Sequence, residues 1–511
     1  MLAFTPPPHQ AAHWQVGKPA ARGRLGVVVA QAHAAAEAGL AMLDAGGNAV
    51  DAAVATAFAL AVVEPWNSGL GGVGFAVVHP AGQPRAEVVD FGPLSPSRLD
   101  PAAFRLTGRK GADLFGWPEV EGDANVHGPL SFCVPSAVAG YHAMHARWGR
   151  LPVADVLEPA IALARRGLPA DWFTLLKVAQ SAATLKLYPE TQRIYLPGGL
   201  PRPAENPAAF IRLGRLADTL ERLAHAGLHD FYNGNIANAV ASDCASRDGV
   251  LAAADLRHYR VGVGPAVELP WRGHTLQLAT ARTAAPALAQ VLERMADVLH
   301  GPQPGPGWYV ALSRALQAAQ ARRRGAEGST THVSVCDAEG GMVALTTTLL
   351  SSFGSRVVLP QSGVLMNNGV MWFDPRPGRA NSVLPDARPL TNMCPLVMRS
   401  EDRPVLALGA SGGRRILPAV LQVLAYVVEF GVDAADAVGL PRIDVSEPGV
   451  VTADHRLPPD VLRADGAVQV VEPTLLPGSF AAPNIVVSGD DGTRVGAADA
   501  ASPWSAALAQ V

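Results

Sequence analysis

The stretch that decides the fold is Ser329-Thr330-Thr331-His332-Val333-Ser334-Val335-Cys336-Asp337, in a chain of 511 residues. Its β-branched residues are typical of a buried strand. After a short Ala-Glu-Gly-Gly segment, a second run of the same kind extends from Met342 to Thr348. Two such runs joined by a glycine-containing turn predict a β-hairpin. Folding the hairpin about that turn brings Thr348 within about one residue of the position opposite Thr330.

These two threonines have two interpretations. As part of an ordinary strand they need no further explanation, and strands of this composition are common. The second interpretation is a hidden N-terminus, exposed when the protein cuts its own Ser329–Thr330 bond. Thr330 would then carry a nucleophilic hydroxyl together with an α-amine whose pKa lies near 8, suitable for a base. The Thr348 hydroxyl would orient that nucleophile.

The composition describes a protein with a large core and few charges. Hydrophobic residues make up 49% of the chain and charged residues 17%, which is ample for packed helices and sheets. The net charge of -3, without a long basic run, argues against a nucleic-acid partner. The four cysteines are scattered without CxxC spacing, so we expect neither a disulfide framework nor a metal, and no cofactor. Of the dispersed histidines, only His332 lies near the proposed chemistry, and a strand histidine is more often structural.

The N-terminal sequence Met-Leu-Ala-Phe-Thr-Pro-Pro-Pro lacks a basic segment followed by an apolar one, so we expect no signal peptide. An uncharged apolar run of about 18 residues, the minimum for a spanning helix, is also lacking. We therefore expect a cytoplasmic protein with no membrane partner.

Along the chain, helical patterns dominate up to residue 329 and strand patterns dominate after it. The expected helices are 34–45, 49–63, 135–148, 153–166, 210–226, 286–298, 309–324 and 416–430. The expected strands are 24–31, 75–78, 86–91, 331–335, 342–348, 357–359, 363–366, 396–398, 405–408, 468–471 and 484–488. Helices on both sides of antiparallel strands predict a layered α/β/β/α body.

The glycine-rich stretch from Gly69 to Gly74 matches GxGxxG. A dinucleotide site needs a strand before such glycines and a helix after them, so that the helix N-terminus meets the pyrophosphate. Here the predicted order is helix, glycines, strand. The stretch is therefore interpreted as a tight turn where backbones pack closely.

A second glycine loop, Gly409 to Arg415, follows a predicted strand and opens a helix, so its backbone N–H groups could hold an oxyanion. The same loop matches GxSxG, the nucleophile elbow of serine hydrolases. Candidate partners for Ser411 follow in the chain order of a Ser-Asp-His triad: Asp433, Asp436, Asp444 and His455. The late position of the elbow and the missing parallel βαβ units count against this alternative.

Three blocks of sequence carry a family resemblance. They are Gly46–Ala53 with Glu64-Pro65 and Ser68–Gly72; Thr330–Val335 with Phe353–Ser355 and Asn367-Asn368; and Arg388–Leu390 with Met393, Pro395, Gly409–Arg415 and Pro441-Arg442. Over nearly its whole length the chain resembles the γ-glutamyltranspeptidase family of N-terminal-nucleophile hydrolases. The resemblance implies a four-layer αββα fold, with antiparallel sheets sandwiched between helices. It favours the hidden N-terminus over the plain strand.

The resemblance also implies a maturation step and roles for individual residues. Thr330 attacks the Ser329 carbonyl, and hydrolysis of the resulting ester gives a large part, 1–329, and a small part, 330–511. Both parts stay associated in one globular domain, and such pairs could dimerise. By the same match Thr348 positions the nucleophile, and Gly412 and Gly413 are the oxyanion donors. Thr391 and Asn392 occupy the place of the family's serine pair that touches substrate.

Four departures from the family pattern bear on the substrate. Where γ-glutamyl enzymes carry polar contacts to the α-amino acid head group, this chain has Gly92, Leu350, Gly369 and Trp372. Each hydrogen bond to a charged group contributes about 1.5–3 kcal/mol, so γ-glutamyl recognition should be severely weakened. The segment between Phe373 and Arg388 is also short, without the lid loop of many relatives, which favours hydrolysis over transfer to an acceptor amine.

The local sequence from Leu349 to Gly378 is similar to the branch that includes bacterial oxamate amidohydrolase, whose substrate is a small carboxylated amide. We therefore expect a small-molecule amide as the partner of this site. One of four arginines could bind its carboxylate by a bidentate pair: Arg376, Arg379, Arg414 or Arg415. A surface or interdomain salt bridge explains each of them equally well.

Other functions are compatible with the same residues. On the same machinery the chain could be a γ-glutamyl hydrolase or transpeptidase, or a β-lactam side-chain acylase. From another class come a serine hydrolase using Ser411 and a catalytically silent relative that only binds a small ligand.

Overall fold

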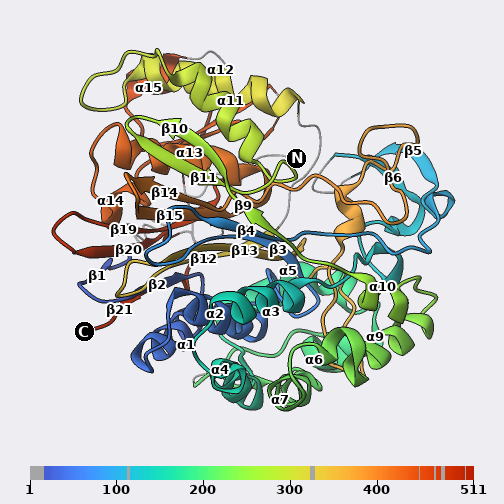
Figure 1. The fold of residues 1–511 in the computed structure, drawn as a ribbon. Coiled ribbons are helices and arrows are strands. Elements are labelled where there is room, and N and C mark those ends of the chain that lie inside the picture. Colours follow the sequence, from blue (N-terminus) through green and yellow to red (C-terminus); the bar gives the residue numbers. More distant parts are fainter. Residues whose placement is uncertain are drawn as a thin grey trace.

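The computed structural model describes residues 17–111, 116–205, 207–322, 329–447, 449–464, 468–472, 478–500 and 502–511. Two seven-stranded sheets lie face to face, with a layer of helices on the outer side of each (Figure 1). This confirms the predicted αββα body of antiparallel sheets between helices. No helix in these ranges is long and apolar enough to cross a membrane.

The predicted hairpin lies in the middle of one sheet, whose strand order is β21-β2-β12-β13-β3-β4-β9. Every neighbouring pair in this sheet is antiparallel. The strands are β2 (Val27–Ala30), β3 (Val73–His79), β4 (Glu87–Phe91), β9 (Gly262–Pro265), β12 (Ser329–Cys336), β13 (Met342–Leu350) and β21 (Ala506–Ala509).

The opposite sheet has the order β1-β20-β19-β15-β14-β11-β10 and is also antiparallel throughout. Its strands are β1 (Ala21–Gly23), β10 (Val267–Trp271), β11 (His274–Leu278), β14 (Leu396–Ser400), β15 (Arg403–Ser411), β19 (Ala482–Ser488) and β20 (Arg494–Ala498). Small apolar side chains fill most of the space between the two sheets, among them Val29, Val77, Ala344, Ala407 and Val486.

The helices form two groups, one against each sheet (Figure 1). Beside the hairpin sheet lie α1 (His33–Asp44), α2 (Ala49–Val63), α3 (Ala137–Trp148), α4 (Val153–Arg166), α5 (Trp172–Leu185), α6 (Pro189–Tyr195), α7 (Leu216–Ala226), α8 (Asp230–Asn233), α9 (Asn235–Ala245) and α10 (Ala253–His258). Beside the other sheet lie α11 (Ala285–Met295), α12 (Pro306–Arg322), α13 (Ile416–Val428), α14 (Ala434–Ala437) and α15 (Pro459–Ala464).

Helix α2 is the packing element directly beneath the hairpin. All fifteen of its residues are buried, and its alanines allow close approach of the sheet on one side and of α1 and α4 on the other. A capping box fixes its start, because the Asn48 side chain accepts from the Asp51 N–H while the Asp51 carboxylate accepts from the Asn48 N–H. The helix therefore begins where the sequence predicted.

Three small sheets complete the chain. They are formed by β5 (Leu106–Lys110) with β6 (Pro118–Val120), by β7 (Leu168–Pro169) with β8 (Phe210–Ile211), and by β16 (Ile443–Asp444) with β17 (Val451–Asp454) and β18 (Val468–Val471). Strand β8 corrects one prediction, because the helix expected over 210–226 begins only at Leu216. Gly214, with a φ of 59°, separates strand from helix.

Two further predictions need correction. The strands expected over 357–359 and 363–366 reduce to a single bridge between Val358 and Leu365, since a turn at Gly363 leaves no room for a longer ladder. The helix expected over 309–324 starts earlier, at Pro306, and residues 323 and 324 lie outside the described residues, as does most of the arginine run before the predicted cleavage point.

The glycine stretch 69–74 forms a turn and the start of β3, as predicted. A Cβ added at Gly71 would lie 2.2 Å from the Leu365 carbonyl oxygen, and one at Gly74 would lie 2.3 Å from that of Thr346. These glycines therefore allow close packing of backbone on backbone and bind no nucleotide through a helix N-terminus.

Replacing Gly74 by alanine should lower the free energy of unfolding by about 3 kcal/mol, because backbone atoms of β13 would have to move away. Gly264→Ala in β9 is the matched control, since a Cβ there meets nothing within 4 Å. We expect that variant to change the free energy by less than about 0.5 kcal/mol in urea unfolding. Equal effects of the two substitutions would contradict the packing argument.

Candidate active site

One end of the two-sheet sandwich collects the predicted site residues, because strand ends that meet there come from antiparallel neighbours. In the hairpin sheet β12 begins at this end with Thr330 nearby, whereas β13 ends there just after Thr348. In the opposite sheet β15 runs into the loop that contains Gly412 and Gly413. Residues of one loop, one hairpin and two sheets thus share a common rim.

The contact that aligns the two sheets at this rim is between His332 and Gly409. A Cβ added at Gly409 would lie 2.2–2.6 Å from three atoms of the imidazole, so only glycine fits there. The ring is buried, and its nitrogens lie 2.7 Å from Thr346 Oγ1 and 3.2 Å from Ser334 Oγ. Burial lowers the pKa of His332 to about 3. The histidine is therefore a neutral packing residue, which settles its two possible roles in favour of the structural one.

A second polar link between the sheets lies one turn of the pleat below. The Ser334 hydroxyl donates to Asn484 Oδ1 at 2.8 Å, and Asn484 Nδ2 donates to the His332 carbonyl at 2.6 Å. Both side chains are buried, so these hydrogen bonds fix the register of β12 against β19.

The hairpin is irregular at the predicted cleavage point. Thr331 pairs with Thr347 and Ser329 pairs with Leu350, so Thr348 and Leu349 together oppose Thr330. This bulge places Thr348 beside Thr330, close to the position expected from the sequence. Leu350 takes a φ of 86°, which is rare for a non-glycine residue, and its N–H donates to Thr348 Oγ1 at 2.8 Å.

Thr330 is 4% exposed and Thr348 is fully buried. The bulge therefore holds the two hydroxyl-bearing residues in a protected position at the start of β12. The backbone strain at Leu350 lies directly across the hairpin from the Ser329–Thr330 bond.

Gly412 and Gly413 have φ values of 131° and 63°, a region in which a side chain would be strained. A Cβ at Gly412 would also lie 2.8 Å from the Ala481 Cα. Gly413 starts a short 3-10 turn that leads directly into α13. The backbone N–H groups of this turn stand at the N-terminal end of a 13-residue helix, a favourable environment for a developing negative charge.

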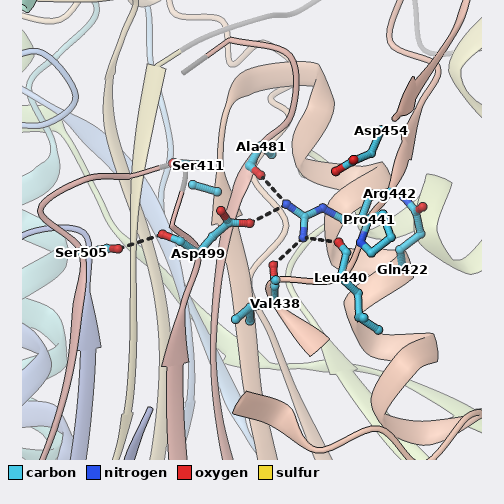
Figure 2. Close-up of polar contacts among 12 residues, drawn as sticks. Ser411, Gln422, Val438, Leu440, Pro441, Arg442, Asp454, Ala481, Asp499 and Ser505 are labelled. Carbon is cyan, nitrogen blue, oxygen red and sulfur yellow. Dashed lines mark hydrogen bonds and ion pairs between the residues drawn. The ribbon is translucent and has the colours of Figure 1, made fainter. Parts of the chain in front are cut away.

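Beneath this loop lies a buried arginine, Arg442 (Figure 2). Its guanidinium forms an ion pair with Asp499, and it donates to the Val438 carbonyl at 2.6 Å and to the Ala481 carbonyl at 3.4 Å. Since Gly412 packs against Ala481, Arg442 holds the segment on which the glycine loop rests.

Arg442→Met should destabilise the protein by about 3–5 kcal/mol, because it leaves Asp499 buried without its hydrogen-bonded cation. The matched control is Arg403→Met, which removes an ion pair with Asp490 whose two side chains are 50% and 97% exposed. That control should change the free energy of unfolding by less than about 1 kcal/mol. Chemical unfolding of both variants checks the difference, and similar losses would contradict it.

The alternative site around Ser411 is not assembled. The Ser411 hydroxyl accepts a hydrogen bond from Gln31 Nε2. Among the candidate partners, Asp433 pairs with Arg22 and Asp444 accepts from Ser446, while His455 lies beside Asp454. In the described part of the chain these groups do not form a Ser-Asp-His triad.

Thr391 and Asn392 lie in the segment that leads into β14. The Thr391 N–H and hydroxyl both donate to the Arg282 carbonyl, at 2.8 and 3.2 Å. The Asn392 Nδ2 atom is buried and, among the described residues, has no hydrogen-bond partner. A buried donor of this kind costs free energy unless a ligand or water satisfies it, which agrees with the predicted contact to substrate.

The four candidate arginines differ in their surroundings. Arg376 is held by Asp374 through two hydrogen bonds of 2.9 and 2.7 Å and lies over the Trp117 ring. Arg379 is exposed. Arg414 and Arg415 are partly buried, and both lie near enough to Asp444 to oppose the rise that burial causes in its pKa. Arg376 is thus committed to a neighbouring carboxylate.

The positions that the resemblance assigns to the γ-glutamyl head group are apolar in the structure. Leu350 and Trp372 belong to one buried cluster, completed by Val73, Phe75, Trp117, Met371 and Met393. At Gly92 an added Cβ would lie 2.6 Å from the Phe75 ring, and at Gly369 it would lie 2.8 Å from Cys133 Sγ. Longer polar side chains therefore do not fit at these glycines.

The sequence analysis missed Glu64, the residue at the C-terminal end of α2. Its carboxyl group is buried and accepts from Asn67 Nδ2 at 2.6 Å. Burial raises its pKa to about 7, and the nearby Thr331 hydroxyl, the Asn67 amide and the Lys177 ammonium oppose that rise. A carboxylate at the end of an apolar helix, just before Pro65, was the available signal.

Glu64 should make stability depend on pH. In the unfolded chain the carboxyl ionises near its ordinary pKa of 4.5, but in the folded protein it keeps its proton to about pH 7. The contribution of Glu64 to stability is therefore largest below pH 4.5 and is lost as pH rises through 7. Glu64→Gln should remove roughly 3 kcal/mol of this dependence.

Urea unfolding at pH 5 and pH 8 measures this effect. The slope for Glu64→Gln should be flatter than that of the wild type, whereas Glu37→Gln, on the exposed face of α1, should leave the slope unchanged. Parallel pH profiles for the wild type and Glu64→Gln would sink the prediction.

Among the described residues, no group of three or more His, Cys, Asp and Glu side chains is placed to hold a metal ion. The groups that meet at the rim are threonine hydroxyls, the Asn392 amide and the backbone N–H groups of the glycine turn.

Comparison with known proteins agrees with this geometry. A family model described as γ-glutamyltranspeptidase matches residues 35–324 and 310–503. The acylase ACY 1 proenzyme of Pseudomonas sp. (strain V22) is 30% identical, over 98% of this chain and 96% of that protein. The glutathione hydrolase proenzyme of Bacillus subtilis (strain 168) is 28% identical, over 86% of this chain and 84% of that protein.

Solved structures show the same fold. A cephalosporin acylase from Bacillus halodurans superposes with a TM-score of 0.84 over 100% of both chains, at 22% sequence identity. The likeness covers the two sheets and both helical layers.

Proposed function

Because the chain belongs to the γ-glutamyltranspeptidase family, we propose that it is a self-processing amidohydrolase that cleaves a small amide through an acyl intermediate on Thr330. The observation that carries the proposal is the convergence of the bulge at Thr330 with the Gly412–Gly413 turn at one rim of the sandwich. The similarity to two proteins named as proenzymes supports the self-processing step.

In maturation, the Thr330 hydroxyl attacks the Ser329 carbonyl, and the Ser329–Thr330 amide becomes an ester. Water then hydrolyses this ester, which leaves a carboxylate on Ser329 and a free α-amine on Thr330. The bulge and the left-handed backbone of Leu350 support this step, because strain beside the scissile bond is relieved when the bond is cut. Residues 1–329 and 330–511 remain together, since β12 pairs with β2 and β13 with β3.

In catalysis, Thr330 Oγ attacks the substrate carbonyl while the Thr330 α-amine accepts the hydroxyl proton. The Thr348 hydroxyl orients the nucleophile. Backbone N–H groups of Gly412 and Gly413 stabilise the oxyanion of the tetrahedral intermediate. The proton passes to the leaving amine, and water then hydrolyses the acyl-Thr330 ester through the same intermediate in reverse order.

We propose that water, not a second amine, is the main acceptor of the acyl group. The segment after Phe373 supports this, because it folds back on itself: the Asp374 N–H donates to the Asn381 carbonyl at 2.8 Å, and Asp374 bridges to Ser382. A segment closed on itself in this way is short for a lid over the rim.

For the substrate we propose a small carboxylated amide of the oxamate type, because the apolar cluster around Leu350 and Trp372 offers nothing to an α-amino group. A second candidate is the amide side chain of a β-lactam, since relatives named as acylases are similar to this chain and an apolar wall suits an acyl group. A γ-glutamyl substrate is less well matched by this wall.

Self-processing is tested by electrophoresis and intact mass. The purified wild type should appear as two fragments of 329 and 182 residues, the second from 511 minus 329. Thr330→Ala should stay whole and release no ammonia from an amide panel that includes oxamate. Ser411→Ala is the control, because it should still cleave itself and retain hydrolase activity.

Two results would count against the proposal. A wild type that stays intact, with activity abolished by Ser411→Ala, would favour the serine-hydrolase alternative. A chain that cleaves itself but hydrolyses no amide would indicate the relative that only binds a small ligand.

A further inference from the structure

A cluster of two arginines on one carboxylate lies at the same rim, apart from the residues of the proposed mechanism. Arg282, in the loop between β11 and α11, donates through Nη2 to Asp90 Oδ2 at 2.9 Å. Arg388 approaches the other oxygen of Asp90, with its Nη1 atom at 3.8 Å. Asp90 also accepts from the Gly92 N–H at 3.0 Å and faces the Thr280 hydroxyl at 3.4 Å.

The two arginines are not equivalent. The Arg388 guanidinium is also bound by the carbonyl oxygens of Gly92 and Arg260 and stacks over Tyr259 at 5.0 Å, so it is well satisfied. The Arg282 side chain is 43% exposed, while its Nε atom is buried without a hydrogen-bond partner among the described residues. Arg282 is therefore the member of the cluster that has donors left for a ligand.

The charges of the cluster do not balance. Asp90 is 5% exposed at its side chain and supplies one negative charge against two guanidinium groups. Arg260, the next charged side chain, adds a further positive charge and donates to the backbone carbonyls of Arg257 and Tyr259. A partly buried surplus of positive charge favours an anionic ligand, and a guanidinium suits a carboxylate by geometry.

The position of the cluster places it at the far end of the substrate region. In the hairpin sheet β4, which carries Asp90, is separated from β12 by β13 and β3, so it lies about 14 Å from the strand of Thr330. Thr391, between these two points, hydrogen-bonds to the Arg282 carbonyl, and the Ala284 N–H donates to the Met393 carbonyl at 2.9 Å. The Arg282 loop and the Thr391–Met393 segment therefore form one continuous wall.

Other positions for a carboxylate contact on this side are closed. The space that a side chain at Gly92 would need is filled by the Phe75 ring. Arg376 is tied to Asp374. Between them lies the apolar cluster that includes Leu350 and Trp372.

We propose that Arg282 binds the carboxylate of an anionic amide substrate, with Arg388 and Asp90 holding its guanidinium in place. This inference rests on the proposed function, since it requires an acyl group attached to Thr330. It also changes the substrate class, because a carboxylate joined directly to the scissile carbonyl would not reach from Thr330 to Arg282. The preferred substrate is a monoamide of a longer dicarboxylic acid, with several carbons between carbonyl and carboxylate.

The test compares carboxylated and neutral amides of equal length on the processed enzyme. Release of ammonia is measured from oxamate, succinamate, glutaramate and adipamate, and from butanamide, pentanamide and hexanamide. The wild type should prefer the longer carboxylated amides over their neutral counterparts. In Arg282→Gln the KM for those substrates should rise by about 10- to 100-fold, with little change in kcat and no change for neutral amides.

Two variants separate binding from loss of structure. Arg282→Lys keeps the positive charge and should retain part of the preference. Arg260→Gln removes an exposed arginine nearby and should behave as the wild type. Electrophoresis of each variant verifies that it still cleaves itself into two fragments.

The outcomes distinguish this inference from the proposed function. If the enzyme hydrolyses oxamate or neutral amides through Thr330 with no preference for longer carboxylated amides, the role of Arg282 is overturned and the amidohydrolase stands. The same holds if Arg282→Gln lowers activity toward neutral and carboxylated amides equally. If no amide is hydrolysed, both proposals fail.

Discussion

The pairing of β12 with β13 is the constraint on which the rest of the structure depends. Both strands are buried on both faces, and side chains alternate between two different environments. Val333 and Val335 face α2, whereas His332 and Ser334 face the other sheet. A slip of one residue would bury the polar pair against the alanines of α2, so the register is tightly specified. The pairing departs from regularity only where β12 begins, at Thr330.

From this register follows the position of the glycine loop on the opposite sheet. The His332 ring fits only against Gly409, and Asn484 ties the His332 carbonyl to β19. With β15 held in this way, its end delivers Gly412 to the same rim as Thr330. Arg442 then fixes Ala481, the residue on which Gly412 packs. The proposed nucleophile and oxyanion donors are thus joined through contacts between the sheets and not through contacts of their own.

The sequence predicted the parts of this arrangement that depend on local pattern. The hairpin, the helix α2 and both glycine loops carry strong signals, because composition and turn residues determine them within a few positions. The edge strands β10 and β11 were missed, since they are five residues long and partly polar, and their stability comes from pairing with each other and with β14. The expected helix at 210 failed because β8 pairs with Leu168–Pro169, a partner distant in sequence.

The candidate site divides in the same way. Thr330, Thr348 and the glycine turn could be proposed from a motif, but Glu64 and the cluster of Asp90, Arg282 and Arg388 could not. The members of that cluster are separated by more than a hundred residues of chain, and only the meeting of the two sheets brings them together. Asp90 was noticed as the residue before Phe91, yet no local pattern shows that an arginine from another strand end neutralises it.

Selectivity at this rim then follows from desolvation. An ammonium group that entered beside Leu350 and Trp372 would lose its hydration and meet only apolar atoms, which is strongly unfavourable. A carboxylate is excluded from the same cluster for the same reason, but it is accepted where a guanidinium with free donors stands at the edge of the wall. The replacement of polar contacts by apolar ones and the presence of Arg282 are therefore two halves of one change. The first removes the requirement for an α-amino group, and the second keeps the requirement for a negative charge.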